Sequence, residues 1–128
     1  MANPGKVAAV VRDYLADVDR EHFVVLLLDA KSRIIGINTV AVGTLDGAPV
    51  HPREVFKAAV LANAACVIVA HNHPSGDPTP SPQDRAVTRL LQRAGDAMRI
   101  PVLDHVIVTA DGASFSFATE AQAAGAVA

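Results

Sequence analysis

The chain has 128 residues, a length typical of one domain, since domains most often contain about 100–150 residues. Hydrophobic residues make up 51% of it, which excludes an intrinsically disordered chain, and its net charge of −2 provides no overall basic surface for nucleic acid. The single cysteine excludes an intrachain disulfide and a CxxC zinc site, so we expect a reducing, cytoplasmic location. No apolar run reaches the roughly 18 residues of a membrane span, and the first residues lack the pattern of a secretory signal.

The first part of the sequence predicts one helix followed by a strand hairpin. Residues 6–18 carry apolar side chains at helical spacing, which is typical of an amphipathic helix. Residues 22–28 are rich in valine and leucine, and residues 34–42 are rich in isoleucine and valine. A polar turn separates the two runs, which predict a pair of strands. A loop follows over residues 43–49.

A second helix and a central strand come next. Pro52 suits the first position of a helix that begins near residue 51, and Val60 and Ala62 belong to its expected buried stripe. Residues 66–70 are continuously apolar, so we expect them to form a strand in the middle of the sheet, covered on both faces.

A third helix begins after a proline-rich loop. Ser81 suits its N-cap, Pro82 its first position and Asp84 its third, where an acidic side chain interacts favourably with the helix dipole. Gly95 is expected to fray or end this helix, since glycine is a poor helix former.

The last part of the sequence predicts two strands over residues 102–109 and 114–118. The Ala-rich residues 119–128 follow as a tail without a core pattern, which we expect to be mobile. The resulting order αββαβαββ predicts one α/β domain over residues 1–118, an α+β sandwich with helices around a central mixed sheet.

Three side chains after the central strand form a candidate site for a divalent metal: His71, His73 and Asp84. Residues i and i+2 of an extended chain project to the same side, so the two histidines point together. Two imidazoles and one carboxylate leave a fourth position for water, as in catalytic zinc sites. On spacing alone, a metal site and a chance coincidence are equally well supported, because Asp84 is also explained as the acid of a helix start.

The segment from His71 to Asp84 follows the spacing His-x-His-x7-Ser-x2-Asp of the JAMM metalloproteases, with Ser81 as its serine. The string HNHPSGDPTPSPQD, with GTLDGAPVHPREVFKAA before it and LDHVIV after it, resembles the C-terminal domain of RadC-type proteins over residues 6–118. This resemblance implies an MPN/JAB-type fold, related to the cytidine-deaminase-like architecture. It also implies a zinc ion (Zn2+) on His71, His73 and Asp84.

The same resemblance implies a glutamate as general base and a role for the motif serine. Glu21, directly before the first strand, matches the base; Glu54 is the reserve candidate, although it fits the acidic first turn of a helix. Ser81 would help to stabilise the developing oxyanion. The chemistry needs such groups, because the attacking water must lose a proton and the leaving nitrogen must gain one.

We therefore expect a zinc-dependent hydrolase of the metallopeptidase or isopeptidase type that cleaves an amide bond of a peptide or protein. The alternative is a non-catalytic MPN-type interaction module associated with DNA repair or processing, because fold alone does not fix function. RadC-type proteins generally carry an N-terminal helix-hairpin-helix segment, and we expect none here because one short helix precedes Glu21. A nucleic-acid partner is therefore supported neither by such a segment nor by the net charge. A nucleobase deaminase would need the signatures H-x-E and P-C-x-x-C, whereas this chain has one cysteine and no acidic residue in place of His73.

Four further residues have weaker functional interpretations. His22, His51 and His105 are candidates for supporting a ligating histidine, although the interpretation as surface or partly satisfied histidines is favoured. Asn72 is best explained by turn geometry.

Overall fold

The computed structural model describes residues 3–16, 18–43 and 50–125, so most of the loop predicted over residues 43–49 lies outside it. Its helices and strands follow one another as α1 (Pro4–Tyr14), β1 (Glu21–Leu28), β2 (Ile34–Gly43), α2 (Pro52–Leu61), β3 (Cys66–Asn72), α3 (Pro82–Met98), β4 (Val102–Val108), β5 (Ser114–Ser116) and α4 (Phe117–Gly125). The strands form one sheet in the order β2-β1-β3-β4-β5, in which β3 and β4 run parallel and the other neighbours antiparallel. This mixed sheet with flanking helices confirms the predicted fold class.

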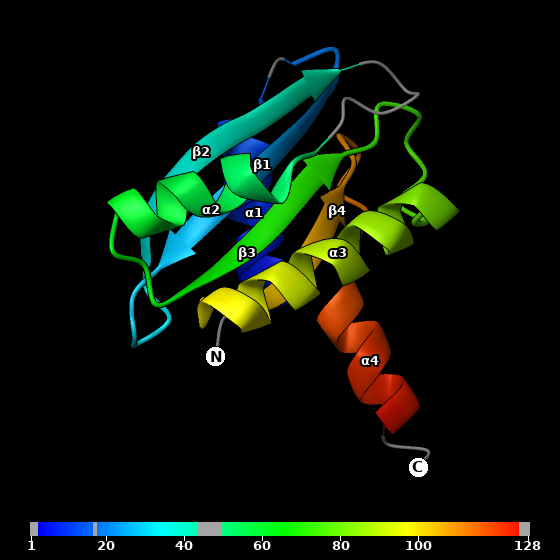
Figure 1. Ribbon diagram of the computed structural model, residues 1–128. Coiled ribbons are helices and arrows are strands. Elements are labelled where there is room, and N and C mark those ends of the chain that lie inside the picture. The colour runs from blue at the N-terminus through cyan, green and yellow to red at the C-terminus, as the bar shows by residue number, and fades with distance from the viewer. Residues whose placement is uncertain (1–2, 17, 44–49, 126–128) are drawn as a thin grey trace.

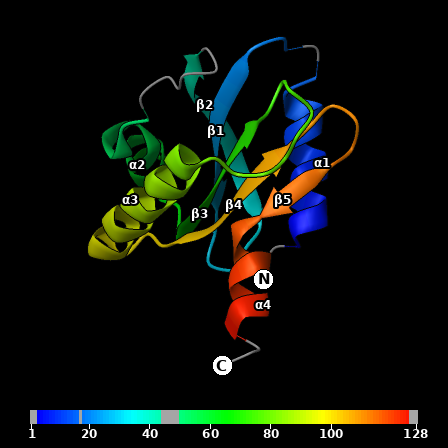
Figure 2. The same ribbon diagram turned by 90° about the vertical axis from the view of Figure 1, so that its right-hand side faces the viewer.

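The sheet lies between two helical layers. Figures 1 and 2 show α1 on one face and α2 with α3 on the other. Along β1, Val24 and Leu26 pack into the α1 core, whereas Val25 and Leu27 pack into the core under α2 and α3. Burial on both faces explains why this strand is a continuous apolar run instead of an alternating one. β3 is buried in the same way and occupies the central position that was predicted for it.

The first two helices both differ from the sequence prediction. α1 ends at Tyr14, four residues earlier than predicted. In α2 the predicted stripe is wrong at Val60, which is 56% exposed, and at Ala62, which is exposed at the C-cap. The helix buries Ala59, and the next residue points about 100° away from it. Within the described ranges, no helix combines the length and apolarity needed to cross a membrane.

Gly95 does not interrupt α3, which continues to Met98. A Cβ atom on Gly95 would lie 2.6 Å from the backbone oxygen of Ile100, where the chain returns toward β4. Glycine is therefore present for close packing. The helix ends instead through Arg99, which adopts the left-handed conformation at φ 58°.

The prediction of a strand over residues 114–118 is wrong in its last two residues, because the chain enters α4 at Phe117. The side chain of Asp104 in β4 explains the change of direction: it accepts hydrogen bonds from the Ser116 hydroxyl and the Ala118 backbone N–H. α4 projects from the body of the domain and buries no residue (Figure 1). The domain boundary predicted at residue 118 falls inside this helix, and mobility of the tail stays a prediction.

Candidate metal centre

The end of β3 and the start of β1 lie together at one end of the sheet, on the face covered by α2 and α3. His71 of β3 pairs with Phe23 of the antiparallel β1. Glu21, two residues before Phe23, therefore lies level with His73, two residues after His71. Strand register alone brings one carboxylate and two imidazoles to the same place.

Asp84 reaches this place from the first turn of α3. Its backbone N–H donates to Ser81 Oγ at 3.0 Å, and its Oδ2 accepts the Ser81 backbone N–H at 2.9 Å. This reciprocal capping box confirms the predicted N-cap and holds the Asp84 carboxylate at the helix N-terminus, where the helix dipole stabilises negative charge.

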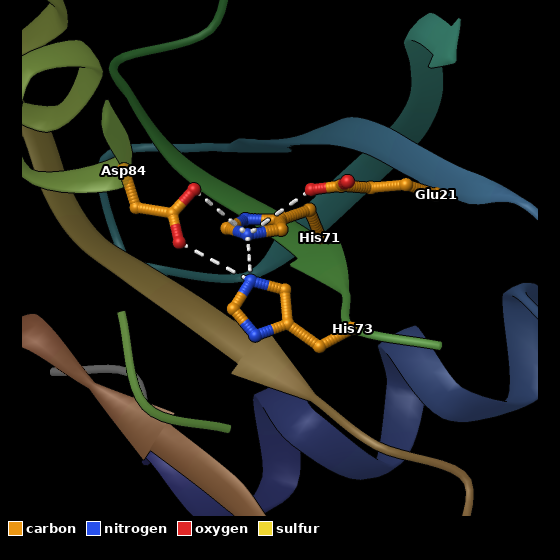
Figure 3. Close-up of side chains that lie close together, drawn as sticks. All are labelled: Glu21, His71, His73 and Asp84. Atoms are coloured by element: carbon orange, nitrogen blue, oxygen red, sulfur yellow. Dashed lines mark hydrogen bonds and ion pairs between the residues drawn. The ribbon is translucent and has the colours of Figure 1, made fainter. Parts of the chain in front are cut away.

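Four side chains converge on one point in Figure 3. His71 Nε2 lies 2.9 Å from His73 Nε2, 3.3 Å from Asp84 Oδ1 and 3.6 Å from Glu21 Oε1. His73 Nε2 lies 3.2 Å from Asp84 Oδ2. The four candidate ligand atoms are all within 4.8 Å of one another, so a single cation could contact the whole set. Imidazole nitrogen and carboxylate oxygen are donors that suit zinc and other first-row divalent metals.

The electrostatics of this cluster favour positive charge at its centre. Burial raises the pKa of the Glu21 carboxyl, although both histidines act in the opposite direction. Contact with Asp84 is the main reason that the pKa of His73 is raised. Burial alone would raise the pKa of Asp84, but the two imidazoles and the Ser81 backbone N–H outweigh it and hold this pKa well below its usual range. A bound cation would provide positive charge at this point, which the cluster otherwise gains by binding protons.

The orientation of His73 is set by the loop that follows it. Its Nδ1 lies 2.8 Å from the backbone oxygen of Asp77, and a carbonyl oxygen only accepts, so this nitrogen carries the N–H. In the neutral form of this imidazole, Nε2 has a lone pair that faces Asp84 and His71. This is the tautomer that a metal-binding histidine needs.

Asn72 has a role that the sequence did not reveal. Its Oδ1 accepts the backbone N–H of His22 at 2.6 Å, and its Nδ2 donates to the backbone oxygen of Arg20 at 2.9 Å. These two bonds bracket Glu21 on both sides and tie the start of β1 to the end of β3. The assignment of Asn72 to turn geometry is therefore incomplete.

The three further histidines occupy different environments. His105 is 1% exposed and lies 2.7 Å from His71, so the preference for a surface histidine is wrong at this position. Full burial lowers the pKa of its imidazole well below the ordinary value. His22 contacts the backbone oxygen of Arg20, and His51 is the exposed residue before α2.

The structure brings together all five residues predicted for the site. Glu21, His71, His73 and Asp84 form the cluster, and Ser81 caps the helix that carries Asp84. The reserve candidate for the base, the exposed Glu54 in the first turn of α2, is outside this cluster. The catalytic and metal-binding roles of the five residues stay predictions.

A cleft of about 280 Å³ opens beside the cluster. Glu21, His73 and Asp84 line it together with Ser81, and apolar side chains such as Val87 form part of its wall. Among the described residues that line this cleft, none is lysine or arginine. A molecule in the cleft would therefore meet the cluster in an acidic, partly apolar environment.

Comparison with known proteins agrees with the motif and the fold. The family model described as "RadC-like JAB domain" matches residues 1–123. Three similar proteins, each called "UPF0758 protein", come from Desulforamulus reducens, Rubrobacter xylanophilus and Pelobacter propionicus. They are 49%, 52% and 56% identical to this chain over 105, 108 and 103 residues, respectively.

These alignments cover 82%, 84% and 80% of this chain but 46%, 48% and 44% of the three relatives. The chain thus spans about half the length of the curated relatives it matches. Their shared name states no reaction, so the chemistry has to be argued from the site.

Proposed function

The chain belongs to the family of RadC-like JAB domains, as its motifs predicted, and from this premise we propose that it is a zinc-dependent hydrolase of the metallopeptidase or isopeptidase type. The observation that carries the proposal is the convergence of two imidazoles and two carboxylates beside an open cleft. Structural zinc sites are closed by four protein ligands, usually including cysteine, whereas hydrolytic sites keep a position for water. Cys66 packs in the α1 core, on the other face of the sheet.

In this proposal His71, His73 and Asp84 hold the zinc ion. Bound there, zinc would polarise the substrate carbonyl and lower the pKa of a coordinated water to about 7. The three residues come from β3, the loop after it and the first turn of α3. The capping box and the backbone oxygen of Asp77 orient two of them before any ligand arrives.

Glu21 acts as the general base. Its carboxylate faces the same point as the ligands, with Oε1 3.6 Å from His71 Nε2, and it also lines the cleft. A carboxylate placed there can accept the proton of the attacking water and pass it to the leaving nitrogen.

Ser81 supplies a hydrogen-bond donor for the carbonyl oxygen. Its Oγ accepts the Asp84 N–H, and among the described residues its hydroxyl donates no hydrogen bond. The residue lines the cleft, so its hydroxyl hydrogen is available to a substrate oxygen on which negative charge develops.

The cleft favours an amide over a phosphodiester as substrate. Glu21, Asp77 and Asp84 line it, and no cationic side chain is among the described lining residues. Such a surface repels phosphate and accepts a neutral or basic peptide segment. We also place the domain in the cytoplasm, where a free, buried Cys66 stays reduced.

Metal analysis and a cleavage screen test this function. The purified chain should bind about one zinc per molecule. Incubation with a peptide library derived from a proteome, followed by mass spectrometry, should reveal new termini that disappear when zinc is chelated. Glu21→Gln should retain zinc and lose activity by roughly 100-fold or more. Glu54→Gln is the matched control and should behave like the wild type.

Two results would contradict the proposal. Failure of the wild type to bind zinc at micromolar supply would remove the metal site. Full occupancy with zinc and no cleavage of any peptide or isopeptide would instead support a non-catalytic interaction module.

A further inference from the structure

The buried His105 contacts the ring nitrogen of His71 that faces away from the metal ligands. Its ring stacks on Phe117, with ring centroids 4.8 Å apart, and meets Phe23 edge-on at 5.5 Å. Despite these apolar neighbours, both of its nitrogens have polar partners. Nε2 lies 2.7 Å from His71 Nδ1, and Nδ1 lies 2.5 Å from Thr88 Oγ1.

The direction of these hydrogen bonds follows from Thr88. Its hydroxyl donates its one hydrogen to the Asp84 backbone oxygen, 2.8 Å away, because a carbonyl can only accept. The same hydroxyl must then accept the N–H of His105 Nδ1. A neutral imidazole has a single N–H, so His105 Nε2 accepts the N–H of His71 Nδ1. In neutral His71 the other nitrogen, Nε2, is left with a lone pair that faces His73 and Asp84.

We propose that Thr88 and His105 are positioning residues that hold His71 in the tautomer and orientation able to bind a metal. This inference rests on the proposed function, because it concerns the metal site assigned there. The hydrogen bonds run from the backbone of Asp84 through Thr88 and His105 to His71. They therefore tie two ligands, one from α3 and one from β3, to each other on the side away from the cleft.

A purely structural role explains the two residues less well. Neither lines the cleft, so neither would contact a substrate. A leucine could fill the space between two phenyl rings without burying two ring nitrogens, and valine has nearly the shape of threonine without its hydroxyl. Either replacement would break the chain of hydrogen bonds that ends at His71 Nδ1. Holding a ligand explains why polar atoms are kept in this apolar place.

The variant pair Thr88→Val and Thr88→Ser tests the hydroxyl directly. Valine should lower zinc affinity roughly 10- to 100-fold, as loss of a group behind a metal ligand usually does, and serine should restore most of it. Zinc affinity is measured by competition with a chromophoric chelator. The visible absorption of the Co²⁺-loaded protein should change with valine and not with serine, because it reports the coordination geometry.

A second pair keeps the test decisive if the valine variant does not fold. His105→Gln offers an amide oxygen to His71 and an amide N–H to Thr88, whereas His105→Leu offers neither. Glutamine should retain more zinc affinity than leucine. In the wild type, ¹⁵N-edited NMR of the imidazole rings should show the Nδ1–H tautomer of both His71 and His105.

The outcomes separate this inference from the function on which it rests. If the wild type binds no zinc, the proposed function fails and this inference fails with it. If the wild type binds zinc and Thr88→Val or His105→Leu binds it equally well, the inference fails alone. An Nε2–H tautomer of His71 in the zinc-loaded protein would also overturn it.

Discussion

The two faces of the sheet bury different kinds of side chain. Under α1 the core cluster is built from valine, leucine, isoleucine and alanine, with Cys66 as a small apolar residue. Under α2 and α3, the end of the sheet beside the cleft buries His71, Thr88 and His105. Both faces contribute stability through burial of apolar area, but the end of the second face beside the cleft also keeps desolvated polar groups that an apolar core would not need. We therefore expect substitutions on the first face to change folding, and substitutions near the cleft to change ligand binding.

Leu26→Ala should show the largest effect, on the α1 face. Leu26 is fully buried in that core, and removal of its side chain leaves a cavity. The free energy of unfolding should fall by about 3 kcal/mol, as is usual for a buried leucine. Denaturant unfolding measures this loss, and zinc affinity of the folded fraction should stay within about twofold of the wild type. A loss of zinc affinity that parallels the loss of stability would show that the two faces are not independent.

Asp84→Asn should show the next largest effect, on zinc binding. The amide oxygen can still accept the Ser81 backbone N–H, so the helix start is preserved. Removal of the charge between the two imidazoles should lower zinc affinity by roughly 100-fold. Asp96→Asn, at an exposed position of the same helix, is the control and should leave zinc affinity unchanged. Equal zinc affinity in the wild type and Asp84→Asn would remove Asp84 from the ligand set.

Gly95→Ala tests the part of α3 that packs far from the cluster. Alanine favours a helix, but its Cβ would lie 2.6 Å from the Ile100 backbone oxygen and 3.2 Å from the Phe56 ring. The clash should outweigh the helix preference and lower the unfolding free energy by about 1–2 kcal/mol, with no change in zinc affinity. Gly125→Ala is the matched control, because nothing lies near its added Cβ. Higher stability of Gly95→Ala would show that glycine is not needed for close packing.

Much of the fold is local enough to be predicted from the sequence. The apolar runs of β1 and β3, and the Ser81 and Pro82 start of α3, depend on neighbouring residues alone. The transition at Phe117 does not, because it depends on Asp104, twelve residues before Ser116, whose carboxylate caps the new helix. Gly95 was misinterpreted for a similar reason: the Phe56 ring, which lies 3.2 Å from an added Cβ, comes from α2, and Ile100 lies near Gly95 because the chain turns back after Arg99.

In the candidate site, too, some residues could be predicted from the sequence and others could not. The spacing of His71, His73 and Asp84 supported a metal site and a chance coincidence equally, and the resemblance to a family favoured the metal site and supplied Glu21. No local pattern could indicate what His105 does, since its contact with His71 depends on the parallel pairing of β3 with β4. The proposed ligands leave a motif in the sequence, whereas His105 reaches His71 only through strand register.

Asn72→Ala should show the smallest of these effects, and it separates the proposed general base from the proposed metal ligands. Asn72 contacts the backbone on both sides of Glu21, so its loss should displace the carboxylate without removing a ligand. We expect turnover of the peptide identified by the cleavage screen to fall about tenfold, equivalent to roughly 1.4 kcal/mol, while zinc affinity changes less than about twofold. Asn38→Ala, at an exposed position of β2, should change neither quantity. A parallel loss of zinc affinity would mean that Asn72 holds His71 and His73, and that the start of β1 is positioned by the sheet alone.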